Sequence, residues 1–403
     1  MHLTAEEQAM LNGDQGEATR KAIEIVVALG RIYGAQELVP VASVQVAGVS
    51  YGNLGEAGLE FIREWAGQGA RVHVPTTLNP AGMDLEAWRE LGITEQYAER
   101  QSEIIKTYQA MGIAPVCSCT PYLIGNQPTR GQHIAWSESS AVSYANSVLG
   151  ARTNREGGPS ALAAAISGRT AKYGLHLGEN RLAHHLIQVK CPVGSIADFG
   201  ALGYVVGKRV GDGVPYFHLN SAARPDAEAL KALGAAMAAS GAVALYHIDG
   251  VTPEATASKA LAEDATRTAI NSLEEGYQAL NSPVEQIDLV WIGCPHASLA
   301  EIERVAALLN GRRVKAPLWV TTARQVVMAA GDRGLLHRIE TSGGKVVADA
   351  CLIGAPLQEM GFSRLATNSG KGAFYLLSHL GLQVRFGPLT RCVDAAVKGR
   401  WPG

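Results

Sequence analysis

Residues 288–310 read "DLVWIGCPHASLAEIERVAALLN". The short apolar run "DLVWIG" is typical of a strand buried on both faces, and residues 298–309 have the apolar spacing of a helix. Between the two lies Cys294, followed by a proline. This strand–loop–helix unit predicts a parallel sheet covered by helices, in which the loops that follow the strands carry the functional residues.

The same alternation recurs along the chain. Other apolar runs are "ELVPVASVQV", "RVHVP", "APVCS", "AVALYHI" and "APLWVTT". Helical spacing is found over 58–68, 85–111 and 225–240, and an opening helical segment starts with a capping box at Thr4. We therefore predict an α/β protein with mostly parallel sheets flanked by helices. Its 403 residues suffice for two or three α/β subdomains, whose boundaries no linker marks.

Composition and charge narrow the class of protein. The chain is 47% hydrophobic and 18% charged, with a formal net charge of -2, as is ordinary for a soluble globular protein. No basic tract favours nucleic acid or a membrane surface as a partner, and no run of about 18 uncharged apolar residues predicts a membrane span. The acidic start "MHLTAEEQAML" is unlike a secretory signal, so we expect a cytoplasmic protein.

Three cysteines share a sequence context. Cys119 in "CSCTP", Cys294 in "GCPH" and Cys351 in "DACLIGAP" each follow an apolar run and precede a turn. Their sulfurs can therefore meet at one sheet edge, and three thiolates on an iron–sulfur cluster leave one iron open to substrate. Cys117 points the same way as Cys119 along a strand, but Cys119 is nearer the turn and is favoured.

Two alternatives to an iron site remain open at this stage. The cysteines can be buried free thiols, because free cysteine is among the most buried residue types. A zinc site is the main metal alternative, since His296 stands two residues after Cys294 and His247 follows the run "AVALY". Neither histidine has the paired spacing of a zinc motif.

Several polar loops are suited to binding an anion. The loops "AGVSYGNLG" (47–55) and "PTTLNPAGMD" (75–84) offer hydroxyl, amide and backbone N–H groups around Ser50 and Asn79. In "TNSGKGAFY" (367–375), Lys371 lies at an expected helix start, where both the dipole and the ammonium attract an anion. It is no nucleotide-binding loop, because Leu365 stands where a Walker A glycine belongs.

The stretch "WSESSAVSYANSVLGARTNREGG" (136–158) concentrates further polar groups. Arg152 and Arg155 offer bidentate forks to carboxylate or phosphate, and Glu138 can orient or move a proton. The alternative is a capped helix with solvated charges.

Taken together, "GVSYGNLGEAG", "TTLNPAGMD", "CSCTPYL", "ESSAVSYANSVLGARTNREGGP", "YGLHL", "GCPHASLAEI" and "ATNSGKGAFY" resemble the aconitase X family. The likeness runs in order over nearly the whole chain. It implies that residues 1–403 form an aconitase-like catalytic unit, the large subunit of a two-subunit enzyme. The small swivelling domain is expected on a separate chain, as a partner that supplies the proton-abstracting serine.

The resemblance also implies the site residues. It places an iron centre on Cys119, Cys294 and Cys351, expected to be a [4Fe–4S] cluster, with a [2Fe–2S] cluster or mononuclear iron as alternatives. Glu138 and Lys371 are expected to be catalytic. The full set expected to bind substrate, with the two arginines added for their charge, is Gly48, Val49, Ser50, Asn79, Pro80, Glu138, Ser139, Arg152, Arg155 and Lys371.

Two substrates are known for the family, 5-phosphomevalonate and cis-3-hydroxy-L-proline. The loops "VSYGNLG" and "TTLNPAGMD" resemble the phosphomevalonate type, which implies dehydration of (R)-5-phosphomevalonate to trans-anhydromevalonate 5-phosphate in the mevalonate route of isoprenoid biosynthesis. Lys371, Arg152 and Arg155 suit a small anionic substrate with roughly three negative charges. The alternatives are a cis-3-hydroxy-L-proline dehydratase and, from another class, a non-catalytic metal-binding subunit.

Overall fold

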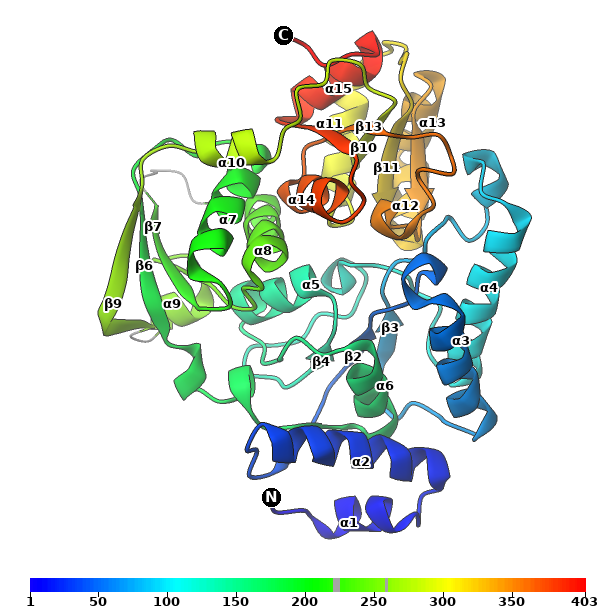
Figure 1. The fold of residues 1–403 in the computed structure, drawn as a ribbon, viewed down its shortest axis with the longest axis vertical. Helices are drawn as coiled ribbons and strands as arrows, with labels where there is room; N and C mark the ends of the chain where they lie inside the picture. Colours follow the sequence, from blue (N-terminus) through cyan, green and yellow to red (C-terminus); the bar gives the residue numbers. More distant parts are fainter. Residues whose placement is uncertain (220–224, 258–259) are drawn as a thin grey trace.

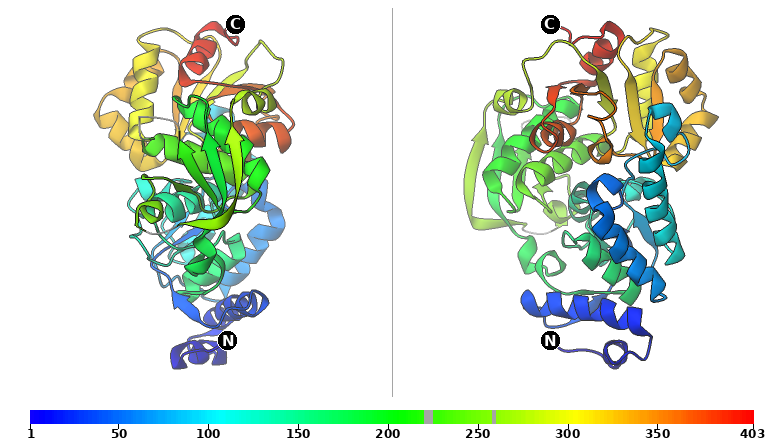
Figure 2. Two further views of the ribbon diagram at one scale, coloured as in Figure 1. Left: turned by 90° about the vertical axis from the view of Figure 1, so that its left-hand side faces the viewer. Right: turned by 45° about the vertical axis from the view of Figure 1, so that its right-hand side comes forward.

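The computed structural model describes residues 1–219, 225–257 and 260–403, and the chain folds into three parts, each built around its own sheet. Figure 1 shows them in chain order: a lower part with the N-terminus, a left-hand part, and an upper part with the C-terminus. The two further views keep the same arrangement (Figure 2). The three parts meet in the middle of the molecule.

The first part contains a parallel sheet of order β3-β2-β4 and a separate antiparallel pair, β1-β5. Helix α6 packs on β2 and α2 packs on α6, while α3 and α4 pack together. Its strands are β1 (Leu38–Pro40), β2 (Val44–Val46), β3 (Thr76–Leu78), β4 (Ala135–Trp136) and β5 (Arg169–Ala171). Its helices are α1 (Ala5–Asn12), α2 (Glu17–Ile32), α3 (Tyr51–Gly67), α4 (Glu95–Ala110), α5 (Ser139–Tyr144) and α6 (Gly158–Ser167).

The second part is a parallel sheet of order β8-β7-β6-β9 with α7 and α8 against it. Helix α8 also packs against α5 of the first part and α14 of the third, so it joins all three parts. The strands are β6 (Ala183–Val189), β7 (Pro215–Leu219), β8 (His247–Ile248) and β9 (Leu261–Ile270). The helices are α7 (Ile196–Val210), α8 (Ala227–Gly241), α9 (Pro253–Ala257) and α10 (Glu274–Ala279).

The third part is a parallel sheet of order β12-β11-β10-β13-β14. Alternate residues of β10 face two cores: Val290 and Ile292 pack with α11 and α15, whereas Leu289 and Trp291 pack with α14. The strands are β10 (Leu289–Ile292), β11 (Leu318–Thr322), β12 (Lys345–Ala348), β13 (Arg364–Thr367) and β14 (Gln383–Phe386). The helices are α11 (Leu299–Leu309), α12 (Arg324–Asp332), α13 (Leu335–Thr341), α14 (Gly370–Ser378) and α15 (Leu389–Lys398).

The α/β class, with mostly parallel sheets between helices, is confirmed. The capping box at Thr4 is also present: its hydroxyl accepts from the N–H of Glu7, and the Glu7 carboxylate accepts from the N–H of Thr4. Among the described residues, no helix is both long and apolar enough to cross a lipid bilayer.

Several local expectations are wrong. The run "APVCS" forms only an isolated bridge, between Cys117 and Leu78, and in "AVALYHI" only His247–Ile248 is a strand. The run "RVHVP" is not a strand, because the N–H groups of Val72 and His73 donate to carbonyls of Met111 and Ala165 rather than to a neighbouring strand, and β3 begins only afterwards. The helix expected over 85–111 is interrupted at Gly92, whose φ of 80° ends a short 3₁₀ turn. Helix α4 then starts beyond Thr94, whose side chain caps it.

Candidate active site

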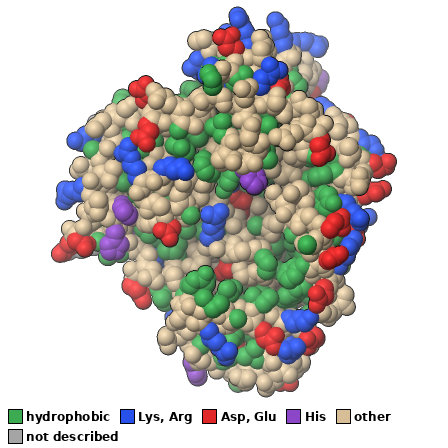
Figure 3. Space-filling model, viewed as in Figure 1, with side chains coloured by type: hydrophobic (Ala, Val, Ile, Leu, Met, Phe, Trp, Pro, Cys, Tyr) green, Lys and Arg blue, Asp and Glu red, His purple; other side chains and the backbone are tan. Residues whose placement is uncertain are grey.

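A cavity of about 300 Å³ lies where the first and third parts meet. Its walls are loops that follow the carboxyl ends of parallel strands: Ser50 follows β2, Glu138 follows β4, Cys294 follows β10 and Lys371 follows β13. Ligands of α/β proteins bind at such strand ends. On the face shown in Figure 3, basic and acidic side chains and a histidine lie together near the middle of the molecule.

The structure brings most of the expected site residues to this cavity. Three of them do not line it: Gly48, Val49 and Arg152. The Arg152 guanidinium instead donates to the carbonyl of His176 at 2.8 Å. The expected residues that do line the cavity are Ser50, Asn79, Pro80, Cys119, Glu138, Ser139, Arg155, Cys294, Cys351 and Lys371.

The three thiols of Cys119, Cys294 and Cys351 lie in the cavity wall, although their loops come from different parts of the chain. Cys117 does not line the cavity: it is 1% exposed and packs in the core of the first part. Within the described ranges, no three His, Cys, Asp or Glu side chains close around a single metal ion.

The two histidines of the zinc alternative do not complete a site with the three cysteines. His296 lines the cavity, but its Nδ1 lies 3.2 Å from the hydroxyl of Ser118 and its Nε2 lies 2.9 Å from the carbonyl oxygen of Ala350. His247 is not among the described lining residues, and its Nε2 bonds the carbonyl oxygen of Arg181 at 2.8 Å. Among the described residues His247 Nδ1 has no hydrogen-bond partner, but the ring does not line the cavity of the three cysteines, and both ring nitrogens of His296 are already bonded.

The cysteine thiols are in an environment that keeps them protonated when no metal is present. Burial raises the pKa of Cys119 and Cys351, and it raises the pKa of Cys294 to about 12. A metal that binds the sulfurs must displace these protons, because thiolate is the ligand form.

Glu138 and Lys371 form a buried ion pair at the floor of the cavity. Asn79 Nδ2 donates to Glu138 Oε2 at 2.8 Å, and the hydroxyl of Ser140 donates to Oε1 at 3.0 Å. Burial acts to raise the pKa of Glu138, but the charge of Lys371 and these hydrogen bonds outweigh it and lower that pKa to about 2. The carboxylate is therefore ionised at neutral pH, and Lys371 is protonated beside it.

Two helix N-termini add to the attraction for anions. Ser50 is the N-cap residue of α3, and Lys371 lies in the first turn of α14, which Ser369 caps. Backbone N–H groups and the helix dipole favour negative charge at such positions. Arg155, exposed at the cavity, has no carboxylate partner among the described residues.

The loop that carries Cys294 depends on a glycine. Gly293 has a φ of 98°, and a Cβ at this position would lie 2.1 Å from the carbonyl oxygen of Thr321. The Thr321 hydroxyl in turn donates to the carbonyl of Gly293 at 2.7 Å. Only glycine fits this left-handed backbone against its neighbouring strand.

Several lining residues were not anticipated from sequence, among them Asn53, Trp291, Tyr375 and His379. Tyr375 and His379 stand four and eight residues after Lys371. Residues four apart lie on one face of a helix, so this spacing was the signal that could have found them. Nothing in the sequence indicated that Trp291 lines the cavity, because a strand residue between two apolar neighbours usually lies in the hydrophobic core.

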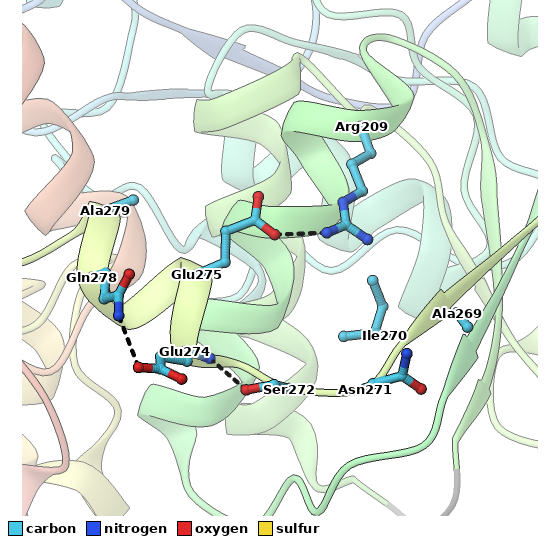
Figure 4. Close-up of a pocket in the computed structure, with 9 residues that line it drawn as sticks. All are labelled: Arg209, Ala269, Ile270, Asn271, Ser272, Glu274, Glu275, Gln278 and Ala279. Carbon is cyan, nitrogen blue, oxygen red and sulfur yellow. Dashed lines mark hydrogen bonds and ion pairs between the residues drawn. The ribbon is translucent and has the colours of Figure 1, made fainter.

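A larger hollow of about 750 Å³ lies between Arg209 and the segment from Ala269 to Ala279 (Figure 4). Arg209 is paired with Glu275 at 2.6 Å, the Glu274 carboxylate accepts from Gln278 at 2.8 Å, and the described lining residues include neither a cysteine nor a histidine. We therefore place the chemistry in the smaller cavity.

Comparison with known proteins agrees with this architecture. Family models for the first, second and third domains of aconitase X match residues 1–179, 183–278 and 287–398, the three parts of the fold. The chain is 51% identical over 383 residues to the phosphomevalonate dehydratase large subunit of Methanothermobacter thermautotrophicus, covering 95% of each. It is 39% identical over 412 residues to the cis-3-hydroxy-L-proline dehydratase of Pseudomonas aeruginosa, covering 99% of this chain and 70% of that one.

A solved structure is also similar. The crystal structure of Thermococcus kodakaraensis aconitase X in its holo-form superposes with a TM-score of 0.91 at 46% sequence identity. The match covers 98% of this chain and 100% of that one.

Proposed function

The chain belongs to the aconitase X family, and we propose that it is the catalytic large subunit of a hydro-lyase that dehydrates (R)-5-phosphomevalonate to trans-anhydromevalonate 5-phosphate. Four relatives with 47–51% identity are named phosphomevalonate dehydratase large subunits. The observation that carries the choice of substrate is the charge of the cavity. That charge is positive once internal ion pairs are discounted.

Glu138 is the one carboxylate among the described lining residues, and Lys371 neutralises it. Arg155 remains without a carboxylate partner in the described part of the chain and can bind the phosphate as a bidentate fork. Hydroxyproline is a zwitterion, and its ammonium group would require a free carboxylate in the cavity. The described lining residues do not provide one. The cavity therefore favours the phosphorylated acid.

The thiolates of Cys119, Cys294 and Cys351 would hold an iron–sulfur cluster. The donor set fits such a group in its chemistry, because three thiols line one cavity and thiolate sulfur is the usual protein ligand of iron–sulfur iron. When bound, the cluster supplies a Lewis-acidic iron for the leaving hydroxyl. A [4Fe–4S] cluster with three protein thiolates is the form we propose.

The remaining residues bind and orient the substrate. The Lys371 ammonium, held in place by Glu138, stabilises the negative charge that develops on the substrate carboxylate as the neighbouring C–H proton leaves. Asn79 Oδ1 is buried without a hydrogen-bond partner, and it can accept from the substrate hydroxyl. Glu138 is ionised and so orients Lys371 and Asn79 rather than donating a proton.

The base that removes the C–H proton is proposed to be a serine of a small-subunit partner. The described lining residues come from residues 47–155 and 291–379. Among their serines, Ser50 and Ser137 donate to backbone carbonyls, and Ser139 lies 3.5 Å from Glu138, whose lowered pKa makes it a weak base. Relatives bear the name "large subunit", which supports a two-chain enzyme.

The test is reconstitution of the anaerobically purified chain with its small subunit. Loss of one water is followed by mass spectrometry, with 5-phosphomevalonate and cis-3-hydroxy-L-proline as parallel substrates. We expect turnover of the phosphorylated acid only. Turnover of hydroxyproline alone would overturn the substrate, and iron-free protein with no turnover of either would indicate a non-catalytic subunit.

The cysteine assignment is tested in the same assay. Cys119→Ser, Cys294→Ser and Cys351→Ser should each lose the iron-dependent colour and the activity. Cys392→Ser is the control, because Cys392 is a buried free thiol that lies in α15 and does not line the cavity. Full turnover in all three variants would overturn the assignment.

A further inference from the structure

His296 touches all three loops that carry the cavity cysteines. It stands two residues after Cys294 and is 1% exposed. Its Nδ1 lies 3.2 Å from the hydroxyl of Ser118, the neighbour of Cys119, and its Nε2 lies 2.9 Å from the carbonyl oxygen of Ala350, the neighbour of Cys351. One side chain therefore connects the three loops.

The chemistry of its partners sets the tautomer of the ring. A carbonyl oxygen can only accept, so Nε2 carries the hydrogen and donates to Ala350. Nδ1 is then an acceptor, and the hydroxyl of Ser118 donates to it. Both ring nitrogens are used in this way, which leaves neither free to bind a metal.

The main chain of His296 adds a fourth contact. Its N–H donates to the Sγ of Cys119 at 3.1 Å. A hydrogen bond to a sulfur stabilises the thiolate form and tunes a bound cluster. The carbonyl of His296 accepts in turn from the buried ammonium of Lys231 at 3.2 Å, which fixes the peptide that carries it.

The connection matters because the loops belong to different parts of the fold. Cys119 follows a short pairing of Cys117 with β3 in the first part, whereas Cys294 and Cys351 follow β10 and β12 in the third part. Backbone hydrogen bonds also join Ala81 of the first part to Asp349 and Cys351, but this pairing does not include the residues next to Cys119 or Cys294. A cluster with three protein ligands requires all three sulfurs at fixed separations.

We propose that His296 is the positioning residue that holds the Cys119, Cys294 and Cys351 loops at the spacing of the iron–sulfur cluster, without being a ligand itself. This inference rests on the cofactor in the proposed function. Residues that orient metal ligands typically change metal affinity by about 10–100-fold when they are replaced.

The test compares His296→Ala, His296→Gln and His247→Ala in the full-length chain. Glutamine keeps a side-chain donor and acceptor. His247 is the matched control, because it is equally buried and also bonds a backbone carbonyl through Nε2, but it does not touch a cysteine loop. Each protein is loaded with iron and sulfide anaerobically, and release of iron to excess chelator is timed.

We expect His296→Ala to release iron about 10–100-fold faster than wild type, with partial rescue in His296→Gln and wild-type release in His247→Ala. The electron paramagnetic resonance signal of the residual reduced cluster should keep the wild-type g-values, since no ligand is lost. Wild-type release rates in His296→Ala would overturn the proposal. Altered g-values would also overturn it, because they would make His296 a ligand.

A second readout needs no cofactor. In the metal-free protein, alkylation of Cys119, Cys294 and Cys351 by a maleimide, followed by mass spectrometry, should be faster in His296→Ala than in wild type and unchanged in His247→Ala. Equal alkylation rates in all three proteins would overturn the proposal that His296 holds the cysteine loops in place. A wild-type protein that holds its cluster but does not dehydrate the substrate would end the proposed function and leave the role of His296 standing.

Discussion

At the scale of single residues, we expect the Glu138–Lys371 pair to have the largest effect on catalysis among the side chains that bind substrate. Lys371→Met removes the cation that we expect to stabilise the reacting carboxylate, and it should lower kcat/KM by about 10²–10³-fold. The same change should raise the pKa of Glu138, because the charge of Lys371 helps to hold it near 2. Steady-state kinetics on the reconstituted enzyme measure the loss.

Lys371→Arg is the informative companion variant, since it keeps the charge but changes the shape of the donor. It should recover part of the activity lost in Lys371→Met. If Lys371→Met retained wild-type kcat/KM, the lysine would have no role in the transition state.

Arg155 should act on binding rather than on the chemical step. Arg155→Gln is expected to raise KM for the phosphorylated substrate by about 10–100-fold with little change in kcat, since a hydrogen bond to a charged group contributes about 1.5–3 kcal/mol. Arg152→Gln is the control on the same segment, because Arg152 binds the carbonyl of His176 and lies outside the cavity wall. An equal effect of both variants would argue against phosphate binding by Arg155.

His176 links pH to stability. Burial, together with the charges of His133, Arg181 and Arg152, lowers its pKa to about 3. Below about pH 6.5 this histidine is protonated in the unfolded chain but stays neutral in the folded chain. The free energy of unfolding therefore decreases as the pH falls from about 6.5 toward 3. At pH 5 this effect lowers the free energy of unfolding by about 2 kcal/mol.

Urea unfolding at pH 7 and pH 5 checks this expectation. The loss of stability between the two values should be about 2 kcal/mol smaller in His176→Gln than in wild type. The exposed His337→Gln controls for removal of a surface histidine. An identical pH dependence in His176→Gln and wild type would contradict the prediction.

At the scale of elements, Gly293 tests how the Cys294 loop is built. Gly293→Ala must place a Cβ against the carbonyl of Thr321 at a positive φ. Gly311→Ala is a matched control, because Gly311 also has a positive φ, of 76°, but nothing lies within 4 Å of its added Cβ. The control should cost about 1 kcal/mol, and Gly293→Ala should cost about 1–3 kcal/mol more, measured by urea unfolding.

Elements with strong local signals could be predicted from the sequence. The helix beginning after Ser298 and strand β10 were both expected, because a buried apolar run and a regular helical spacing are sufficient to specify them. The prediction of a strand at "RVHVP" was wrong because tertiary contacts outweighed the local pattern. This run alternates like a strand, but tertiary contacts to Met111 and Ala165 use its N–H groups.

The candidate site divides in a similar way. Cys119, Cys294 and Cys351 line one cavity. This could be predicted, because each cysteine follows an apolar run in the sequence and the loops after parallel strands meet at one edge of a sheet. The role of His296 cannot be predicted in this way, since its partners Ser118 and Ala350 are far away in the chain. The position of Arg152 could not be predicted either, because the sequence does not indicate in which direction the guanidinium points.

At the scale of the whole molecule, the second part packs behind the helices that carry the site. No described residue of 183–278 lines the cavity. Helix α8 instead packs against both α5, which follows Glu138, and α14, which carries Lys371. The second part therefore acts as a rigid backing that fixes the two helices relative to each other.

The buried ammonium of Lys231 makes a polar link between the second and third parts. It pairs with Glu228 of α8 at 2.6 Å and with Glu301 of α11, and it donates to the carbonyl of His296. Lys231→Met leaves two carboxylates buried without their cation. Breaking a buried pair in this way costs about 3–5 kcal/mol, because the remaining charge is uncompensated.

We therefore expect Lys231→Met to lower the free energy of unfolding of the metal-free chain by about 3–5 kcal/mol. Arg312→Met removes one partner of an exposed pair with Asp394 and should cost at most about 1 kcal/mol. Unfolding in urea is followed by tryptophan fluorescence, which reports the first and third parts, and by circular dichroism, which reports all three. The two transitions should coincide in wild type and separate in Lys231→Met, since the second part loses its polar tie to the third. Coincident, unshifted transitions in the variant would show that apolar packing of α8 alone unites the parts.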